Sequence, residues 1–88
     1  MELLRHKQFI NDFKKLKLSD SQFQKMIRYF HLLQDTKLLP KESRDHELKG
    51  NYKGFREFHL GGDMLVIYYK EENQITLARI GTHSQLFN

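Results

Sequence analysis

Apolar residues follow a helical period in the first third of the chain. They form two stripes, the first at Phe9, Ile10, Phe13 and Leu16 and the second at Phe23, Met26, Ile27, Phe30 and Leu33. Ser19 and Gln22 have the spacing of a capping box before the second stripe, and Pro40 ends this helix by residue 39. Residues 2–4 can form a short strand ahead of the first stripe. The pattern predicts two amphipathic helices separated by a short break, which together make a helical hairpin.

The period changes from helical to alternating after Pro40. Residues 41–53 are polar and charged, and strands are predicted after them at residues 54–60, 63–70 and 74–80. Gly61-Gly62 predicts the first hairpin turn and residues 71–73 predict the second. The run from Met64 to Tyr69 is apolar on both faces, which predicts a central strand. The expected fold class is α+β, with the N-terminal helical hairpin packed on one face of a small antiparallel sheet.

Strand alternation also predicts which side chains face the helices. A period of two places Phe58 on the helix side of its strand and His59 on the opposite side. In the last strand it places Arg79 on the same side as Leu77, opposite Ile80. We therefore expect His59 to point away from the helices.

Composition limits the class of protein. A chain of 88 residues predicts one domain over residues 1–88, and 39% hydrophobic with 30% charged residues argues against disorder. The sequence contains no cysteine, which excludes disulfides and thiolate chemistry. Its apolar runs are too short to cross a bilayer and its first residues lack a signal-peptide core, so we expect no membrane partner and a cytoplasmic location. The net charge of +4 favours an anionic partner, either nucleic acid or an acidic protein.

Three segments combine histidine or arginine with acidic or aromatic residues. They are Asp45–Gly50, Phe55–Asp63 and Arg79–Phe87. Histidine transfers protons near neutral pH, and arginine binds phosphate as a planar fork. These residue types together predict metal-free chemistry on a phosphodiester. His6 and His31 match none of the three segments, and we interpret both as structural or surface residues.

The chain resembles the RelE/ParE superfamily of bacterial toxins, and within it the YafQ-like branch. The resemblance rests on Asp45-His46-x-Leu48-x-Gly50, on Phe55-Arg56-x-x-His59 with Asp63, and on Arg79-x-Gly81-Thr82-His83-x-x-Leu86-Phe87. It implies a RelE-like microbial RNase fold and an mRNA endonuclease that cuts codons in the ribosomal A site, where it meets mRNA and rRNA. It also implies a cognate antitoxin protein that holds the toxin inactive. One position departs from the branch, because Met64 stands where a large aromatic residue is usual.

The resemblance also implies a set of active-site residues. By motif position these are His46, His59, Asp63, Arg79, His83 and Phe87. For attack by the RNA 2′-hydroxyl, we interpret His83 as the general acid and Arg79 as the phosphate-binding group. The base is His46 or His59, and Asp63 either orients one imidazole or acts as the base itself. Phe87 can stack on a nucleotide base, and positive charge to neutralise RNA phosphates is expected from Lys49, Lys53 and Arg56.

Each of these roles has a structural alternative. His83 can be a surface loop residue, and His46 can belong to a solvated charge cluster. Arg79 can be an ion-pair partner of Glu57 or Asp63, and Phe87 can be a core residue that closes the sheet. Zinc binding by the three histidines and Asp63 lacks the short ligand spacing of such sites, so no metal and no cofactor is predicted.

Two other functions remain open. A ParE-like toxin binds gyrase and does not cleave RNA, although acid–base histidines are not needed for binding alone. A ribosome-independent RNase would need a complete catalytic set of its own, and the sequence does not separate this function from ribosome-dependent cleavage.

Overall fold

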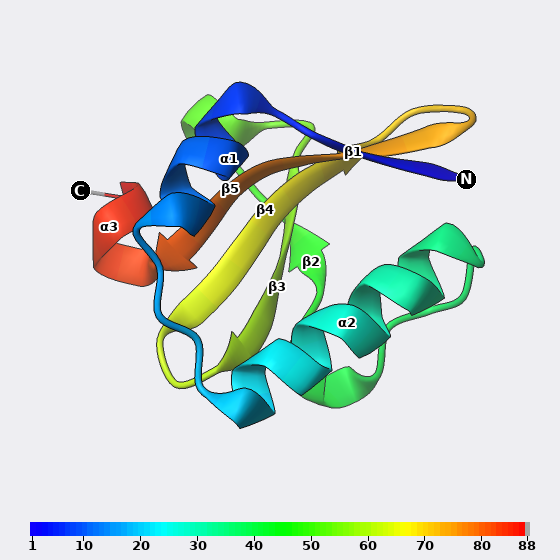
Figure 1. The fold of residues 1–88 in the computed structure, drawn as a ribbon. Coiled ribbons are helices and arrows are strands. Elements are labelled where there is room, and N and C mark those ends of the chain that lie inside the picture. Colours follow the sequence, from blue (N-terminus) through cyan, green and yellow to red (C-terminus); the bar gives the residue numbers. More distant parts are fainter. Residues whose placement is uncertain (88) are drawn as a thin grey trace.

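Five strands form one sheet in the computed structural model, which describes residues 1–87. The strands are β1 (Glu2–Arg5), β2 (His46–Glu47), β3 (Arg56–Gly61), β4 (Met64–Lys70) and β5 (Gln74–Thr82). Their order is β1-β5-β4-β3-β2, so the predicted central strand is confirmed as β4. β4 pairs antiparallel with β3 and β5, whereas β1 runs parallel to β5 (Figure 1). The expectation of a wholly antiparallel sheet is therefore wrong at β1.

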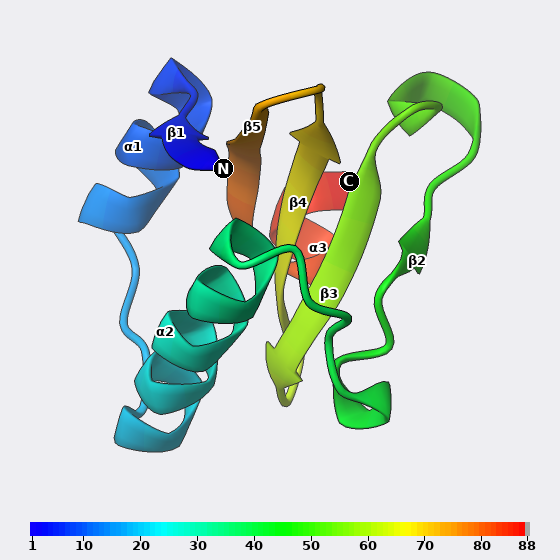
Figure 2. The same cartoon turned by 90° about the vertical axis from the view of Figure 1, so that its right-hand side faces the viewer.

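The two long helices cover one face of this sheet. They are α1 (Lys7–Lys14) and α2 (Asp20–Gln34), and Figure 2 shows both on the same side of the strands. The predicted capping box is confirmed at α2, where Ser19 Oγ accepts the Gln22 N–H at 3.1 Å and Gln22 Oε1 accepts the Ser19 N–H at 3.0 Å. The predicted N-terminal helical hairpin is wrong. The chain starts with β1, and α1 packs along β5 whereas α2 packs on β3.

The main core lies between these helices and the sheet. Phe58 is fully buried there, with its ring 5.6 Å from that of Tyr29 in an edge-to-face contact. The other buried members are Phe9, Met26, Leu33, Leu60, Met64, Val66, Tyr68, Ile75, Leu77 and Ile80. The helix side of the sheet therefore holds most of the apolar surface that stabilises the fold.

The opposite face of the sheet carries a smaller apolar cluster. Its buried members are Leu65, Ile67, Ala78 and Leu86, with Leu48, Tyr52 and Phe55 packed against them. Short elements cover this face in place of long helices. These are the 3₁₀ turn η2 (Gly50–Tyr52) and the C-terminal helix α3 (His83–Phe87), while another 3₁₀ turn, η1 (Lys41–Ser43), precedes β2. Polar side chains can therefore reach solvent between these elements.

A bulge in β5 changes the faces on which its side chains lie. Ile67 of β4 is opposite Arg79, but Tyr68 is opposite Leu77, so Ala78 has no partner in the register. An extra residue of this kind interrupts the period of two. Ile80 consequently joins Leu77 in the helix-side core, and Arg79 pairs with Ile67 of the other face. The predicted side of Arg79 is wrong for this reason.

The helix α3 packs closely on the end of β5. Thr82 Oγ1 accepts the Gln85 N–H at 3.3 Å, and Gln85 Oε1 accepts the Thr82 N–H at 2.8 Å, which starts the helix directly after the strand. A Cβ atom on Gly81 would lie 2.9 Å from Gln85 Oε1 and 3.2 Å from Leu86 Cδ2. Glycine at this position therefore allows the helix to approach. No helix within residues 1–87 is long and apolar enough to cross a membrane.

Candidate active site

One row of side chains crosses the face opposite α1 and α2. The register aligns His46 with Glu57, Glu57 with Ile67, and Ile67 with Arg79. Paired residues share a face, and three inter-strand spacings of about 4.8 Å place the ends of the row about 14 Å apart at Cα. His59 lies on the same face two residues after Glu57, as predicted. The sheet therefore brings the predicted residues of three separate segments onto one surface.

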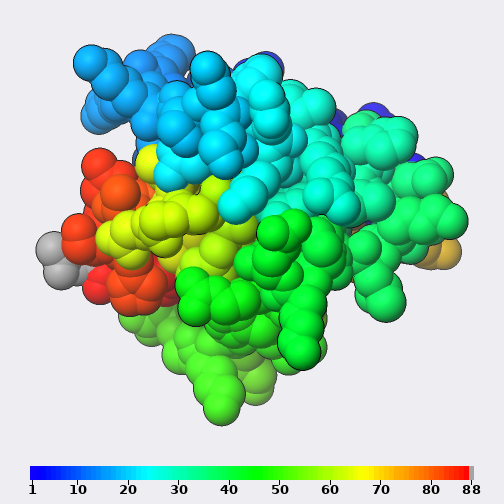
Figure 3. Space-filling model, turned by 90° about the horizontal axis from the view of Figure 1, so that it is seen from below, coloured from blue at the N-terminus to red at the C-terminus, as the bar shows by residue number. Residues whose placement is uncertain are grey.

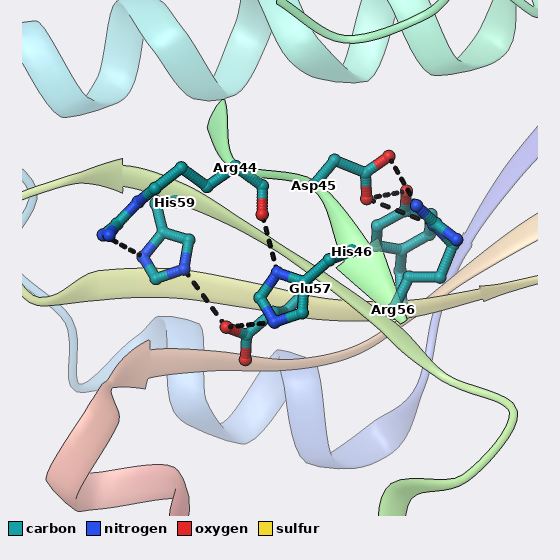
Figure 4. Close-up of polar contacts among 7 residues, drawn as sticks. Arg44, Asp45, His46, Arg56, Glu57 and His59 are labelled. Carbon is teal, nitrogen blue, oxygen red and sulfur yellow. Dashed lines mark hydrogen bonds and ion pairs between the residues drawn. The ribbon is translucent and has the colours of Figure 1, made fainter. Parts of the chain in front are cut away.

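Glu57 lies at the centre of the histidine pair. Its Oε2 atom is 3.1 Å from His59 Nε2 and 3.4 Å from His46 Nε2, and Figure 4 shows both rings turned toward the carboxylate. The Glu57 residue is only 5% exposed, whereas His46 lies at the surface. A buried carboxylate requires such partners to offset its desolvation. The sequence analysis missed Glu57 as a site residue, although its spacing of two from His59 puts both on one face of the strand.

Arg44 fixes the protonation pattern of the two imidazoles. His46 Nδ1 lies 2.8 Å from the Arg44 carbonyl oxygen, which can only accept, so Nδ1 of His46 carries a proton. His59 Nδ1 lies 3.2 Å from Arg44 Nη2, which can only donate, so His59 carries its proton on Nε2 and donates it to Glu57. Both histidines therefore present Nε2 to the same carboxylate oxygen, but this atom carries a proton in His59 and a lone pair in the neutral ring of His46.

A second group of contacts anchors the segment that carries His46. The Tyr68 hydroxyl donates to Asp45 Oδ1 at 2.6 Å, and Arg56 donates from Nε and Nη2 to the same carboxylate at 3.3 and 3.4 Å. Burial lowers the pKa of Arg56, but the bond to Asp45 and its charge outweigh burial and raise it. Burial, followed by the bond to Asp45, raises the pKa of Tyr68. Arg56, predicted as an RNA contact, thus holds the loop next to His46.

Arg79 forms the shortest ion pair of the site. Its Nε donates to Asp12 Oδ2 at 2.7 Å and its Nη2 donates to Asp12 Oδ1 at 3.1 Å. Asp12 Oδ2 also accepts the backbone N–H of Ile80 at 3.1 Å, so α1 holds the end of β5. The hydrogen bond to Asp12 raises the pKa of Arg79. The alternative of an ion pair is correct in kind, but the partner is Asp12 rather than Glu57 or Asp63.

The remaining motif residues meet at the end of the sheet. His83 is the first residue of α3 rather than part of a turn, and its N–H donates to the Asp63 carbonyl at 3.1 Å. Its ring centroid lies 4.7 Å from that of Phe87. Phe87 is 38% exposed, and the residue that closes the core here is the buried Leu86. Viewed from below, the turn before β4 and the C-terminal helix lie side by side on the surface (Figure 3).

Aromatic side chains that were not predicted as site residues lie on the same face as the row, and one of them, Tyr52, contacts α3. The Tyr52 ring is 5.5 Å from Phe87 and 5.7 Å from Phe55, and Phe55 is 5.1 Å from Tyr69. Tyr52, Phe55 and Tyr69 line a cavity of about 340 Å³ together with Arg79. The exposed Lys49 and Lys53 flank η2 in the same segment. The surface therefore combines stacking groups with positive charge.

A family profile described as "Bacterial toxin of type II toxin-antitoxin system, YafQ" matches residues 1–88. The chain belongs to the YafQ toxin family. The mRNA interferase toxin YafQ of Escherichia coli K12 is 38% identical over 56 residues, which are 64% of this chain and 61% of that protein. The chain thus matches less than two thirds of the length of this curated relative.

Solved structures extend the YafQ likeness to the whole fold. The toxin in the E. coli DinJ–YafQ complex is 30% identical, with a TM-score of 0.83 over 99% of this chain and 98% of that chain. A copper-bound mutant toxin from Helicobacter pylori is 35% identical, with a TM-score of 0.83 over 98% of both chains. These agreements confirm the predicted family and the α+β class.

The histidine pair of this YafQ-family chain also fits a transition-metal ion. One donor atom from each of His46, Glu57 and His59 lies within 4.8 Å of the other two. Two imidazoles and a carboxylate are ligands that zinc and copper accept. In the part of the chain that the structure describes, Asp63 and His83 are not members of this group, so the zinc set considered from the sequence is not assembled.

Proposed function

We propose that this protein is the toxin of a type II toxin–antitoxin pair and that it cleaves mRNA in the ribosomal A site. The observation that carries the proposal is the buried Glu57 carboxylate between two imidazoles, in the same row as the Arg79 guanidinium. The mRNA interferase named among its relatives supports the same activity. Acid–base groups and a fixed cation on one open surface are what phosphodiester cleavage by a 2′-hydroxyl requires.

The proposed reaction needs one base and one acid. The base takes the 2′-hydroxyl proton, the 2′-oxygen attacks phosphorus, and the bond to the 5′-oxygen breaks to leave a 2′,3′-cyclic phosphate. His83 protonates the departing 5′-oxygen. The base is His46 or His59. Either Asp63 or Glu57, which lies beside both rings, orients an imidazole or acts as the base itself. A positioned acid or base contributes typically about 10²–10⁴-fold to the rate.

Arg79 is proposed to bind the scissile phosphate. Asp12 engages the Nε and Nη2 atoms, which leaves Nη1 outside that bidentate pair. The ion pair fixes the guanidinium plane before RNA arrives, and a fixed donor stabilises developing charge without reorganisation. Removal of one such donor reduces rates by about 10²–10³-fold.

Lys49, Lys53 and Phe87 are proposed as RNA contacts around this centre. The two lysines are exposed, and Phe87 is exposed beside the His83 ring. Base stacking on an aromatic ring contributes about 1–3 kcal/mol in single-strand binding. The Arg56 guanidinium already pairs with Asp45 and Glu47, so its proposed role is to hold the loop that carries His46. Its contact with an RNA phosphate stays a prediction.

No metal ion enters the proposed chemistry. A transition-metal ion held by His46, Glu57 and His59 would act as a Lewis acid, but it would also occupy the lone pairs of both candidate bases. The reaction needs one of those imidazoles free to take a proton. The side chains alone therefore carry each proposed step.

An antitoxin is the proposed protein partner. The E. coli relative in the DinJ–YafQ complex supports a partner of this kind. A net charge of +4 favours an acidic or amphipathic segment that wraps the basic surface. Binding over the open face would block RNA and would stabilise the toxin by mass action.

The test compares His83→Ala with Ser84→Ala in growing bacteria. Both residues are exposed on α3, so neither change should unfold the protein. We expect the Ser84 variant to arrest growth and to leave new mRNA 5′ ends in frame with codons, dependent on translation. We expect the His83 variant to do neither while it still binds antitoxin. Full toxicity of His83→Ala would refute its role as the acid.

The same experiment separates the alternative functions. Growth arrest with intact mRNA would indicate a gyrase-binding toxin. Cleavage of free RNA by the purified wild-type protein, at the same sites and without ribosomes, would indicate a ribosome-independent RNase. Cleavage products without a 2′,3′-cyclic phosphate end would contradict attack by the 2′-hydroxyl.

A further inference from the structure

The cavity beside Arg79 has two walls that come from distant parts of the chain. One wall is aromatic, because the Phe55 ring lies 5.7 Å from that of Tyr52 and 5.1 Å from that of Tyr69. The other wall is His6 and Gln8 at the start of α1, a helix that begins directly after β1 and packs on β5 (Figure 1). The cavity therefore joins the open face of the sheet to the first helix.

The bulge in β5 gives this cavity its cation. Consecutive strand residues normally point to opposite faces, but Ala78 and Arg79 both line the cavity. Asp12 holds the Arg79 guanidinium through Nε and Nη2. Among the residues that the structure describes, no acidic one lines the cavity. A nucleotide whose phosphate binds Arg79 therefore has its base, one ribose away, within reach of the cavity.

His6 offers a fixed donor on the α1 side. Its backbone N–H donates to the Leu77 carbonyl at 2.8 Å, and its Nδ1 atom accepts the Gln8 N–H at 3.0 Å. An accepting Nδ1 carries no proton, so the ring is protonated at Nε2 and donates there. The Gln8 side chain adds an amide, which both donates and accepts. Within residues 1–87, neither His6 Nε2 nor this amide has a hydrogen-bond partner, so both can bind a ligand.

We propose that this cavity is a base-binding subsite, in which a nucleobase next to the scissile phosphate stacks on the aromatic wall and is recognised by His6 and Gln8. The inference rests on the proposed function, because Arg79 orients the nucleotide. A volume of about 340 Å³ is at the lower end of the roughly 300–1,000 Å³ of small-molecule pockets, which suits a single base. Aromatic rings stack on any base, and two fused rings cover more of the wall than one. A purine therefore binds more tightly than a pyrimidine.

Binding is measured by NMR titration of the purified protein with three 2′-O-methyl dinucleotides, which have no 2′-hydroxyl to attack and stay intact. The first carries adenine and guanine, the second carries two uracils, and the third is abasic at both positions. We expect the abasic ligand to bind at least roughly fivefold more weakly than the purine ligand, which corresponds to about 1 kcal/mol, the lower end for base stacking. The uracil ligand should lie between them. The amide signals of His6, Gln8 and Ala78 should shift with the purine ligand and not with the abasic one.

His6→Asn removes the Nε2 donor but keeps the helix cap, because asparagine is a preferred N-cap whose side-chain oxygen accepts a backbone N–H. Gln8→Ala removes the amide at an exposed position. We expect each variant to bind the purine ligand about 2–10-fold more weakly, the size of one hydrogen bond, and the abasic ligand unchanged. Gln24→Ala, the same change at an exposed position of α2, is the matched control and should alter neither affinity.

Ala78→Val tests the space inside the cavity. The two added methyl groups occupy part of the volume, so the purine ligand should lose more affinity than the abasic ligand. Because Ala78 is itself buried, urea unfolding checks that this variant is folded. The exposed variants His6→Asn and Gln8→Ala test the subsite whether or not Ala78→Val folds.

Equal affinity of the purine and abasic ligands for the wild-type protein would overturn the subsite, even if the protein cleaves mRNA. An equal loss for both ligands in His6→Asn and Gln8→Ala would overturn base recognition by these side chains. A protein that binds the purine ligand through them but cleaves no mRNA would refute the proposed function and leave the subsite standing.

Discussion

The two faces of the sheet differ in what they hold. The face under α1 and α2 buries a continuous apolar core, whereas the opposite face holds a small apolar cluster and the polar row from His46 to Arg79. Strand β3 belongs to both, because Phe58 and Leu60 face the core while Glu57 and His59 face the row. Stability and chemistry are therefore separated by the alternation of one strand. Substitutions on the two faces should have different consequences.

The largest effect on stability is expected on the helix side, from Phe58→Ala. Phe58 is fully buried and contacts the rings of Tyr29, Phe30 and Tyr68. Truncation of such a residue costs about 3–5 kcal/mol. Urea unfolding should show a loss of this size, while Phe87→Ala on the open face changes stability little and lowers cleavage. A similar loss of unfolding free energy in Phe58→Ala and Phe87→Ala would contradict the distinction between the two faces.

Asp12→Asn tests the point where α1 reaches the open face. The change weakens the bidentate bond to Arg79 and the bond to the Ile80 N–H. Hydrogen bonds to charged groups contribute about 1.5–3 kcal/mol, and both side chains are at least about three-quarters buried, so a loss in this range is expected by urea unfolding. RNA cleavage should fall as well. Asp35→Asn, an exposed residue after α2, is the control, and an equal effect there would contradict the prediction.

Gly81→Ala tests whether activity depends on the position of α3 more than on the stability of the fold. The new Cβ would meet Gln85 and Leu86 at 2.9 and 3.2 Å and displace α3. Overpacking of this kind costs about 1–3 kcal/mol, and His83 would move with the helix. We expect toxicity to be lost although the protein remains folded, and we expect NMR spectra to show amide shifts confined to α3. Unchanged α3 resonances with full toxicity would argue against the contact.

The smallest effect concerns pH and Tyr68, which links the two faces through Asp45. Its folded pKa is raised above the usual 10.0 by burial and by Asp45, so the unfolded chain loses this proton first as pH rises. The stabilisation is thus complete below about pH 10 and is lost above it, at up to about 1.4 kcal/mol per pH unit. Tyr68→Phe should flatten the alkaline stability curve measured by urea unfolding, with Tyr69→Phe as control. An unchanged slope in Tyr68→Phe would refute the assignment.

Local sequence patterns predicted the elements better than their long-range pairing. The Ser19–Gln22 capping box is confirmed, and the first predicted hairpin turn is present one residue later than expected, at Gly62 and Asp63, because both features depend on neighbouring residues. Strand β1 was considered, but its parallel pairing with β5 joins distant segments that no local period reveals. The bulge at Ala78 moved Arg79 to the other face, because a single extra residue reverses alternation.

The sequence predicted several residues of the candidate site but few of the contacts between them. His46, His59 and Arg79 lie on one face, as a shared site requires. Glu57 and Asp12 were missed as members of the site because His46 contacts Glu57 from another strand and Arg79 contacts Asp12 from 67 residues away. Charged residues in an alternating strand or an amphipathic helix are usually solvated, so their pattern gives no sign of burial. Their catalytic or positioning roles remain predictions.

The pairing of β1 with β5 also sets an order of events during synthesis. Glu2 aligns with Gln74 and Arg5 with Leu77. Strand β1 therefore cannot pair until β5 has been synthesised, about 70 residues later. Pairings of such long range form slowly, because the chain between them must first be closed into a loop. Until β5 has left the ribosome, the row also lacks Arg79. A nascent copy of this chain therefore lacks a complete candidate site for most of its translation.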